Sequence, residues 1–143
     1  MDVLAQLAPR LRDTRFAAEM IPGHRREVGL DEGSNCQRYA YAVLAAFGVD
    51  VPPFRSDDLW ADVSVTRQVT VPEPLDLVLY GPSDDPFGAH VGVCLGGTKV
   101  LHLCEEIGTP IVWDFEDFAA RPRYRSQIGF KRSLALPTAP RVR

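Results

Sequence analysis

One cysteine and two histidines have the residue types and spacing that nucleophilic catalysis requires. Cys36 follows Ser34 and Asn35, which are favoured helix N-cap residues, and an apolar pattern of helical period begins directly after it. Cysteine is a strong nucleophile only as thiolate, and the start of a helix lowers the pKa of a thiol. A histidine must then take the thiol proton, and a second polar group must orient that histidine. His90 and His102 are the candidates for these two roles.

The two histidines fall in a predicted β-hairpin. Apolar and other residues alternate on both sides of the turn signal Gly96-Gly97-Thr98. With a three-residue loop, Gly92 faces His102, and His90 lies diagonally from His102 on the same face, roughly 7–8 Å away at the backbone. Because Gly92 has no side chain, the two rings have room to meet, whereas a two-residue loop would place them on opposite faces. The other face then carries core residues, namely Val91, Val93, Leu95, Leu101 and Leu103.

The remaining cysteines favour no metal centre. Cys94 and Cys104 are interpreted as buried reduced thiols, since three cysteines at irregular spacing suit neither a disulfide scaffold nor a zinc ribbon. A metal site made of His90, His102 and Cys104 is the alternative, but it would leave Cys36 unexplained. We therefore expect no metal and no organic cofactor.

The clearest helix is the one that begins at Cys36. Its apolar residues recur three and four positions apart until Gly48, a plausible C-cap, and Pro52-Pro53 prevents continuation. Shorter helices are predicted around 56–60 and 115–119. Strands are predicted over 63–71, 75–80, 90–95, 99–104, 107–113 and 128–133.

Helices followed by a meander of strands indicate an α+β fold, with the Cys36 helix packed on a mostly antiparallel sheet. A length of 143 residues predicts a single domain. Within it, residues 1–20 form an N-terminal helical extension that breaks near Pro9, and residues 137–143 form a disordered tail.

The composition excludes several partners. A net charge of -3 with 45% apolar and 24% charged residues gives no reason to expect nucleic acid or an acidic membrane surface. No stretch reaches the ~20 apolar residues that span a bilayer. Because the N-terminus shows no secretory signal, the cytoplasm is the default location, with phage association or another export route as alternatives.

These motifs resemble those of the NlpC/P60-type cysteine hydrolases, a papain-like family that cuts cell-wall peptides. Cys36 matches the nucleophile at the start of a helix. Residues 75–81 are similar to the family's Gly-Asp-Leu-Val-Phe-Phe-Gly strand, and residues 90–96 to its His-Val-Gly-Ile-Tyr-Leu-Gly strand. His102 then takes the position of the third catalytic residue. The resemblance covers roughly residues 20–133.

The resemblance implies a papain-like fold and a thiol hydrolase that cleaves amide bonds in peptidoglycan stem peptides, such as a D-glutamyl–diamino-acid bond. Cys36 would attack the carbonyl, His90 would act as base and then as acid, and His102 would orient His90. The expected partner is a peptide or peptidoglycan fragment. The sequence predicts no oligomeric state.

The surroundings of the nucleophile depart from the family pattern. Where the family reads Asp-Cys-Ser-Gly, this chain reads Asn-Cys-Gln-Arg, and His24 stands where a tyrosine grips the free amine of the substrate. We expect Asn35, Gln37 and His24 to be substrate-binding residues. The departures keep three alternatives open: acyl transfer by the same thiol machinery, an amide substrate outside the cell wall, and a catalytically degenerate binding or tail-assembly module.

Overall fold

A computed structural model describes residues 2–13 and 35–136 of the chain. His24, the predicted loop around it and the predicted tail over 137–143 lie outside the described residues. The helices are α1 (Val3–Gln6), α2 (Pro9–Arg12), α3 (Cys36–Ala46), α4 (Ser56–Ala61), α5 (Phe115–Ala119) and the 3-10 turn η3 (Pro122–Tyr124). The strands are β1 (Thr66–Val69), β2 (Leu77–Gly81), β3 (His90–Gly96), β4 (Lys99–Leu103), β5 (Pro110–Asp114) and β6 (Ser126–Ser133).

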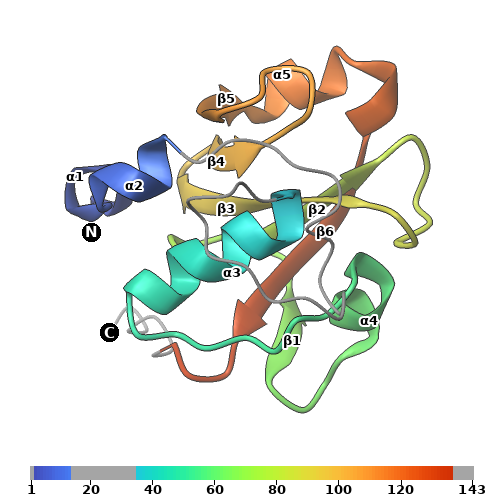
Figure 1. The fold of residues 1–143 in the computed structure, drawn as a ribbon. Coiled ribbons are helices and arrows are strands. Elements are labelled where there is room, and N and C mark those ends of the chain that lie inside the picture. Colours follow the sequence, from blue (N-terminus) through green and yellow to red (C-terminus); the bar gives the residue numbers. More distant parts are fainter. Residues whose placement is uncertain (1, 14–34, 137–143) are drawn as a thin grey trace, which may run out of the picture.

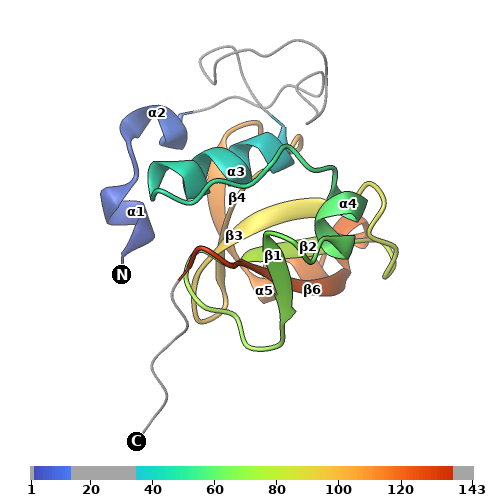
Figure 2. The ribbon, with the colours of Figure 1, turned by 90° about the horizontal axis from the view of Figure 1, so that it is seen from below.

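The six strands form one antiparallel sheet in the order β1-β6-β2-β3-β4-β5 (Figure 1). Strands β2 to β5 follow one another as a meander, and β6 returns to lie beside β2. Helix α3 crosses β3 and β4, while α5 lies toward the other side of the sheet (Figure 2). The α+β prediction, with the Cys36 helix packed on a mostly antiparallel sheet, is confirmed. Strand β1 covers only residues 66–69 of the predicted 63–71, and β5 begins at Pro110 instead of residue 107.

Helix α3 begins and ends where its sequence predicts. The Asn35 side chain accepts a hydrogen bond from the backbone N–H of Arg38 at 3.0 Å, which satisfies one of the free donors of the first turn. Gly48 ends the helix with a φ of +80°, a conformation that costs glycine little. The apolar side of α3 packs on β3 and β4 through Tyr39, Ala40, Val43 and Leu44.

The sheet is covered on both faces. Beneath α3, a mainly aliphatic core also includes Val91, Val93, Leu101 and Leu103, as the hairpin alternation predicts. The opposite face carries an aromatic cluster formed by Tyr80, Trp113, Phe118, Tyr124 and Phe130.

The β3–β4 hairpin reaches the predicted register by a different turn. Cys94 pairs with Val100 and Gly96 pairs with Lys99, so the loop has two residues and Leu95 forms a bulge. The prediction of a three-residue loop is wrong. A regular two-residue loop would have placed His90 and His102 on opposite faces of the hairpin, but the extra bulged residue keeps them on the same face. Gly92 therefore lies against His102, and a Cβ placed on it would come within 3.3 Å of the His102 Cβ.

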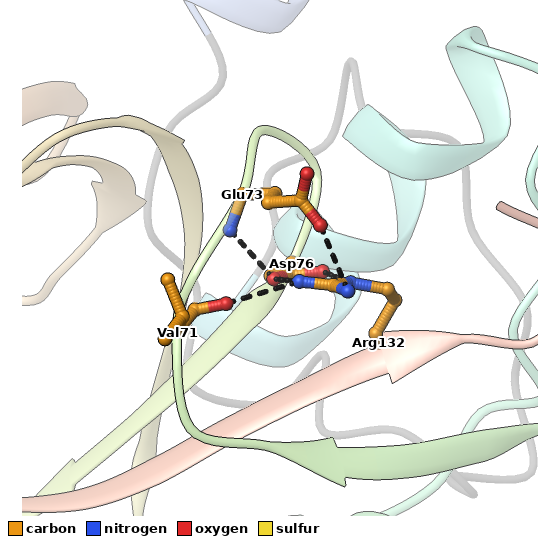
Figure 3. Close-up of polar contacts among 4 residues, drawn as sticks. All are labelled: Val71, Glu73, Asp76 and Arg132. Carbon is orange, nitrogen blue, oxygen red and sulfur yellow. Dashed lines mark hydrogen bonds and ion pairs between the residues drawn. The ribbon is translucent and has the colours of Figure 1, made fainter. Parts of the chain in front are cut away.

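A buried ion-pair network joins the start of β2 to β6 (Figure 3). Arg132 binds both carboxylate oxygens of Asp76 at 2.7 Å and also contacts Glu73 at 2.8 Å and the Val71 carbonyl at 3.1 Å. Asp76 is fully buried, and it also accepts a hydrogen bond from the Glu73 backbone N–H. Leu75, directly before it, holds a φ of +74° and is buried in the aliphatic core. Burial of this leucine offsets a backbone conformation that costs about 1–2 kcal/mol.

In the part of the chain that the structure describes, no helix combines the length and apolar character needed to cross a membrane.

Candidate active site

His90 and His102 form a hydrogen-bonded pair between β3 and β4. His90 Nε2 lies 2.9 Å from His102 Nδ1, and the two rings meet edge to face with centroids 5.0 Å apart. The hairpin register thus brings the rings together, as predicted. Because Nε2 of His90 is used in this contact, Nδ1 is the atom left to exchange a proton with a nucleophile.

An aromatic enclosure keeps both histidines neutral. The His102 ring lies 4.3 Å from Trp113 and 4.6 Å from Phe118, and the His90 ring lies 4.7 Å from Tyr124. Burial lowers the pKa of His90 to about 3, with a further contribution from the charge of Arg123. Burial likewise lowers the pKa of His102 to about 2.

One fully buried atom of the pair, His102 Nε2, has no hydrogen-bond partner among the described residues. A neutral imidazole has one N–H donor and one acceptor nitrogen. If His90 donates from Nε2 to Nδ1 of His102, the His90 Nδ1 lone pair is free to act as a base, and His102 carries its hydrogen on the unpaired Nε2. Only this tautomer makes His90 a general base, and it leaves a buried donor unsatisfied at a cost of about 1–3 kcal/mol.

Cys36 is the first residue of α3 and is half-buried. Burial raises the pKa of its thiol to about 11, and this effect outweighs the lowering by hydrogen bonds from the backbone of Val91, of Gln37 and of Cys36 itself. The prediction that the helix start lowers the thiol pKa is therefore wrong for this arrangement, because desolvation exceeds the field of the helix. The site at rest holds a neutral thiol and a neutral imidazole.

Cys36 and His90 open into the same cleft, which has a volume of about 640 Å³. Its walls come from the start of α3, the start of α4, the β2–β3 loop and η3. His102 does not line the cleft and lies behind His90. The lining residues are Asn35, Cys36, Gln37, Arg55, Ser56, Asp57, Tyr80, Pro82, Phe87, Gly88, Ala89, His90, Glu105, Pro122, Arg123 and Tyr124.

Asn35 and Gln37 line the cleft but are hydrogen bonded to the protein. Asn35 caps α3 and donates from its amide to Gln37 Oε1 at 3.3 Å. Gln37 in turn makes a long contact of 3.5 Å from Nε2 to the carbonyl of Ala89, the residue before His90. In this structure the two side chains connect the start of α3 to the residue before β3.

Sequence reasoning missed three features of the cleft. Ser56 accepts a hydrogen bond from the Ala89 N–H at 3.0 Å and donates to the Pro86 carbonyl at 2.6 Å, which fixes the segment before His90. Arg123 and Tyr124 form the wall beside His90. No motif marks these residues, since they come from the start of α4 and from η3, which only the folded chain brings together. Over residues 2–13 and 35–136, no three side chains of metal-binding type gather as a metal site would require.

No protein-family model and no curated protein matches the sequence. Solved structures do resemble it. The NlpC/p60 domain of the peptidoglycan hydrolase SagA shares 21% identity with a TM-score of 0.56, over 82% of this chain and 91% of that one. The P60 domain of antigen MAP1204 from M. avium subspecies paratuberculosis shares 20% identity with a TM-score of 0.50, over 79% of this chain and 82% of that one.

A third structure is similar over only part of its length. NlpC1 from Trichomonas vaginalis shares 13% identity with a TM-score of 0.54, over 82% of this chain and 38% of that one. The chain thus has the NlpC/P60 fold, which the motifs around Cys36 and His90 predict.

Proposed function

We propose that the protein is a thiol hydrolase that cleaves amide bonds in peptidoglycan stem peptides through Cys36, His90 and His102. The observation that carries the proposal is that His90 lines the same cleft as Cys36 and uses Nε2 to contact His102 behind it, which leaves His90 Nδ1 available as a base. The likeness to a domain of a peptidoglycan hydrolase supports this choice of substrate.

The reaction begins with both groups neutral. Cys36 Sγ attacks the carbonyl carbon while its proton moves to His90 Nδ1, so the thiolate forms only as the S–C bond forms. The backbone N–H of Cys36, at the free start of α3, stabilises the developing oxyanion. His90 then gives the proton to the leaving amine, the C–N bond breaks, and an acyl thioester stays on Cys36. Water, deprotonated by His90, hydrolyses the thioester and restores the thiol.

His102 acts on His90 and does not touch the substrate. Its Nδ1 accepts the hydrogen bond from His90 Nε2, which fixes the tautomer of His90 and stabilises the positive charge that forms on it during the attack. The surrounding Trp113 and Phe118 rings hold His102 in place.

The proposal is tested by hydrolysis of a muropeptide panel. We expect Cys36→Ala to lower kcat/KM by more than about 1,000-fold, because no other group on the cleft can form the thioester. Cys94→Ala is the matched control, since Cys94 is buried on β3 away from the cleft. Full activity of Cys36→Ala would contradict the mechanism. Thioester and lipid acyl donors in the same panel separate hydrolysis from acyl transfer.

A second candidate is a catalytically degenerate binding module on the same fold. It is favoured by the raised pKa of Cys36 and by the internal hydrogen bonds of Asn35 and Gln37, which occupy groups that could otherwise bind substrate. Muropeptide binding by calorimetry with no turnover, and no change in affinity for Cys36→Ala, would establish this candidate instead.

A further inference from the structure

The turn η3 forms a fixed wall of the cleft beside His90. It follows α5 and packs against α5 and β2. Pro122, Arg123 and Tyr124 all line the cleft. Tyr124 is buried and its ring lies 4.7 Å from that of His90, so the turn is held at a set distance from the reacting atoms.

Arg123 differs from the two arginines on either side of it. Arg121 pairs with Glu106 at 3.2 Å and lies over the Trp113 ring, and Arg125 donates to the Pro82 carbonyl at 2.8 Å. Arg123 is exposed, and its guanidinium lies 5.6 Å from the centroid of the Tyr124 ring, but it makes no ion pair or hydrogen bond to any described residue. Its guanidinium has five N–H donors in a planar fork that suits a carboxylate.

Three other charged residues line the cleft. Arg55 and Asp57 stand near the start of α4, and Glu105 follows β4, all without an ion pair among the described residues. Arg123 is the charged residue that acts on His90, where its charge adds to burial in lowering the pKa. The positive charge that acts on His90 therefore comes from η3.

We infer that Arg123 binds a carboxylate of the substrate beside the scissile bond, so that the enzyme selects amides that carry an anionic group at that position. The inference rests on the proposed function, since it assigns a specificity residue to the same cleft. It also has a chemical consequence. A carboxylate on Arg123 offsets the charge that opposes formation of the His90 imidazolium, so an anionic substrate favours proton transfer from Cys36 more than a neutral one.

Two small electrophiles of nearly equal size test the inference. Iodoacetate carries a carboxylate and iodoacetamide carries a neutral amide in its place. In both reactions Sγ of Cys36 bonds to the CH₂ carbon, the C–I bond breaks with loss of iodide, and the thiol proton passes to His90 or to water. The measurement is the ratio of the two second-order rate constants at Cys36, followed by mass spectrometry of the peptide that contains it.

We expect the iodoacetate-to-iodoacetamide ratio to fall by about three- to tenfold in Arg123→Gln, to stay near the wild-type value in Arg123→Lys, and to fall further in Arg123→Glu. Arg67→Gln is the matched control, because Arg67 is exposed on β1 at the far edge of the sheet and its loss changes the net charge equally. The Cys36→Ser variant measures how much of either reagent reacts with the other two cysteines.

An unchanged ratio in Arg123→Gln would overturn the inference. Failure of both reagents to reach Cys36 would overturn it as well, because a carboxylate substrate must approach the same atom. The ratio requires no hydrolysis, whereas the proposed function is read from muropeptide turnover in Cys36→Ala, so each can fail without the other.

Discussion

Two buried polar pairs in the same sheet are built in opposite ways. Asp76 and Arg132 join β2 to β6, and every oxygen and nitrogen that faces inward has a partner (Figure 3). His90 and His102 join β3 to β4 in an aromatic enclosure, and His102 Nε2 has no hydrogen-bond partner among the described residues. The first pair meets the usual requirement for buried polar groups, and the second does not.

The contrast separates a pair that holds the fold from the pair to which we assign a role in catalysis. A satisfied ion pair is costly to break, because the remaining charge stays buried. An unsatisfied imidazole lowers stability, and such a cost is expected where function requires it. The His90–His102 pair should therefore be dispensable for folding and essential for activity, whereas Asp76–Arg132 should be the reverse.

His90→Ala gives the largest expected effect. We predict a fall in kcat/KM of about 100- to 10,000-fold on muropeptides, since the proposed mechanism uses His90 as both base and acid. Its thermal midpoint should fall less than that of Asp76→Ala, because the substitution leaves no buried charge without a partner. Activity assays and calorimetry on one preparation check both. A His90→Ala variant that is strongly destabilised but keeps its specific activity would show that His90 serves folding and not catalysis.

Asp76→Ala should show the opposite pattern. We expect a loss of about 3–5 kcal/mol in the free energy of unfolding, because Arg132 keeps its buried charge and loses its bidentate partner. Urea denaturation measures the loss, and the folded fraction should keep its kcat. The double variant Asp76→Leu/Arg132→Met removes both charges and should recover part of the stability. A double variant no more stable than Asp76→Ala would show that charge burial is not the cause.

Gly92→Ala tests the space that the histidine pair requires. A Cβ at this position would come within 2.5 Å of a Val100 methyl carbon and 3.3 Å of the His102 Cβ. We predict a loss of about 1–3 kcal/mol in stability from overpacking, together with reduced activity from displacement of His102. Adding Val100→Ala should restore both in part. Full activity of the single variant would mean that the pair tolerates displacement.

Acid should destabilise the protein through the histidine pair. Both pKa values are lower than the ordinary 6.5, so the unfolded chain binds protons that the folded chain does not bind as the pH falls from about 6.5 to about 3. Stability is therefore lost on acidification, by at most about 2 kcal/mol per histidine between pH 7 and pH 5. Urea denaturation at both pH values should show a smaller loss in His102→Asn than in wild type. Equal losses of stability in His102→Asn and in wild type would contradict the claim that burial of His102 lowers its pKa.

Sequence reasoning predicted the site where local pattern determines it. The N-cap at Asn35 and the helical period place Cys36 at the start of α3, and the alternation in β3 and β4 places both histidines on one face. The hairpin turn was mispredicted because a bulge at Leu95 adds a residue that composition does not reveal. The predicted register of His90 against His102 is nevertheless correct, because the aliphatic residues on the other face of the hairpin must point into the core.

The electrostatics of the site could not be predicted from local pattern. The thiol pKa depends on how deeply Cys36 is desolvated, which is a property of the whole fold and opposes the helix-start effect that the sequence suggests. Arg123 and Tyr124 were missed for a related reason. They reach the cleft through a turn some ninety positions beyond Cys36, and only the folded sheet brings the two segments together.

The most direct test of the account is to trap the acyl-enzyme. Wild-type protein mixed with a muropeptide and quenched within a turnover should carry the acyl fragment on the peptide that contains Cys36, as seen by mass spectrometry. The adduct should form far more slowly in His90→Ala and should be absent from Cys36→Ala. Product release by Cys36→Ala at the wild-type rate, with no adduct on Cys36 in wild type, would contradict the claim that Cys36 and His90 form the catalytic centre.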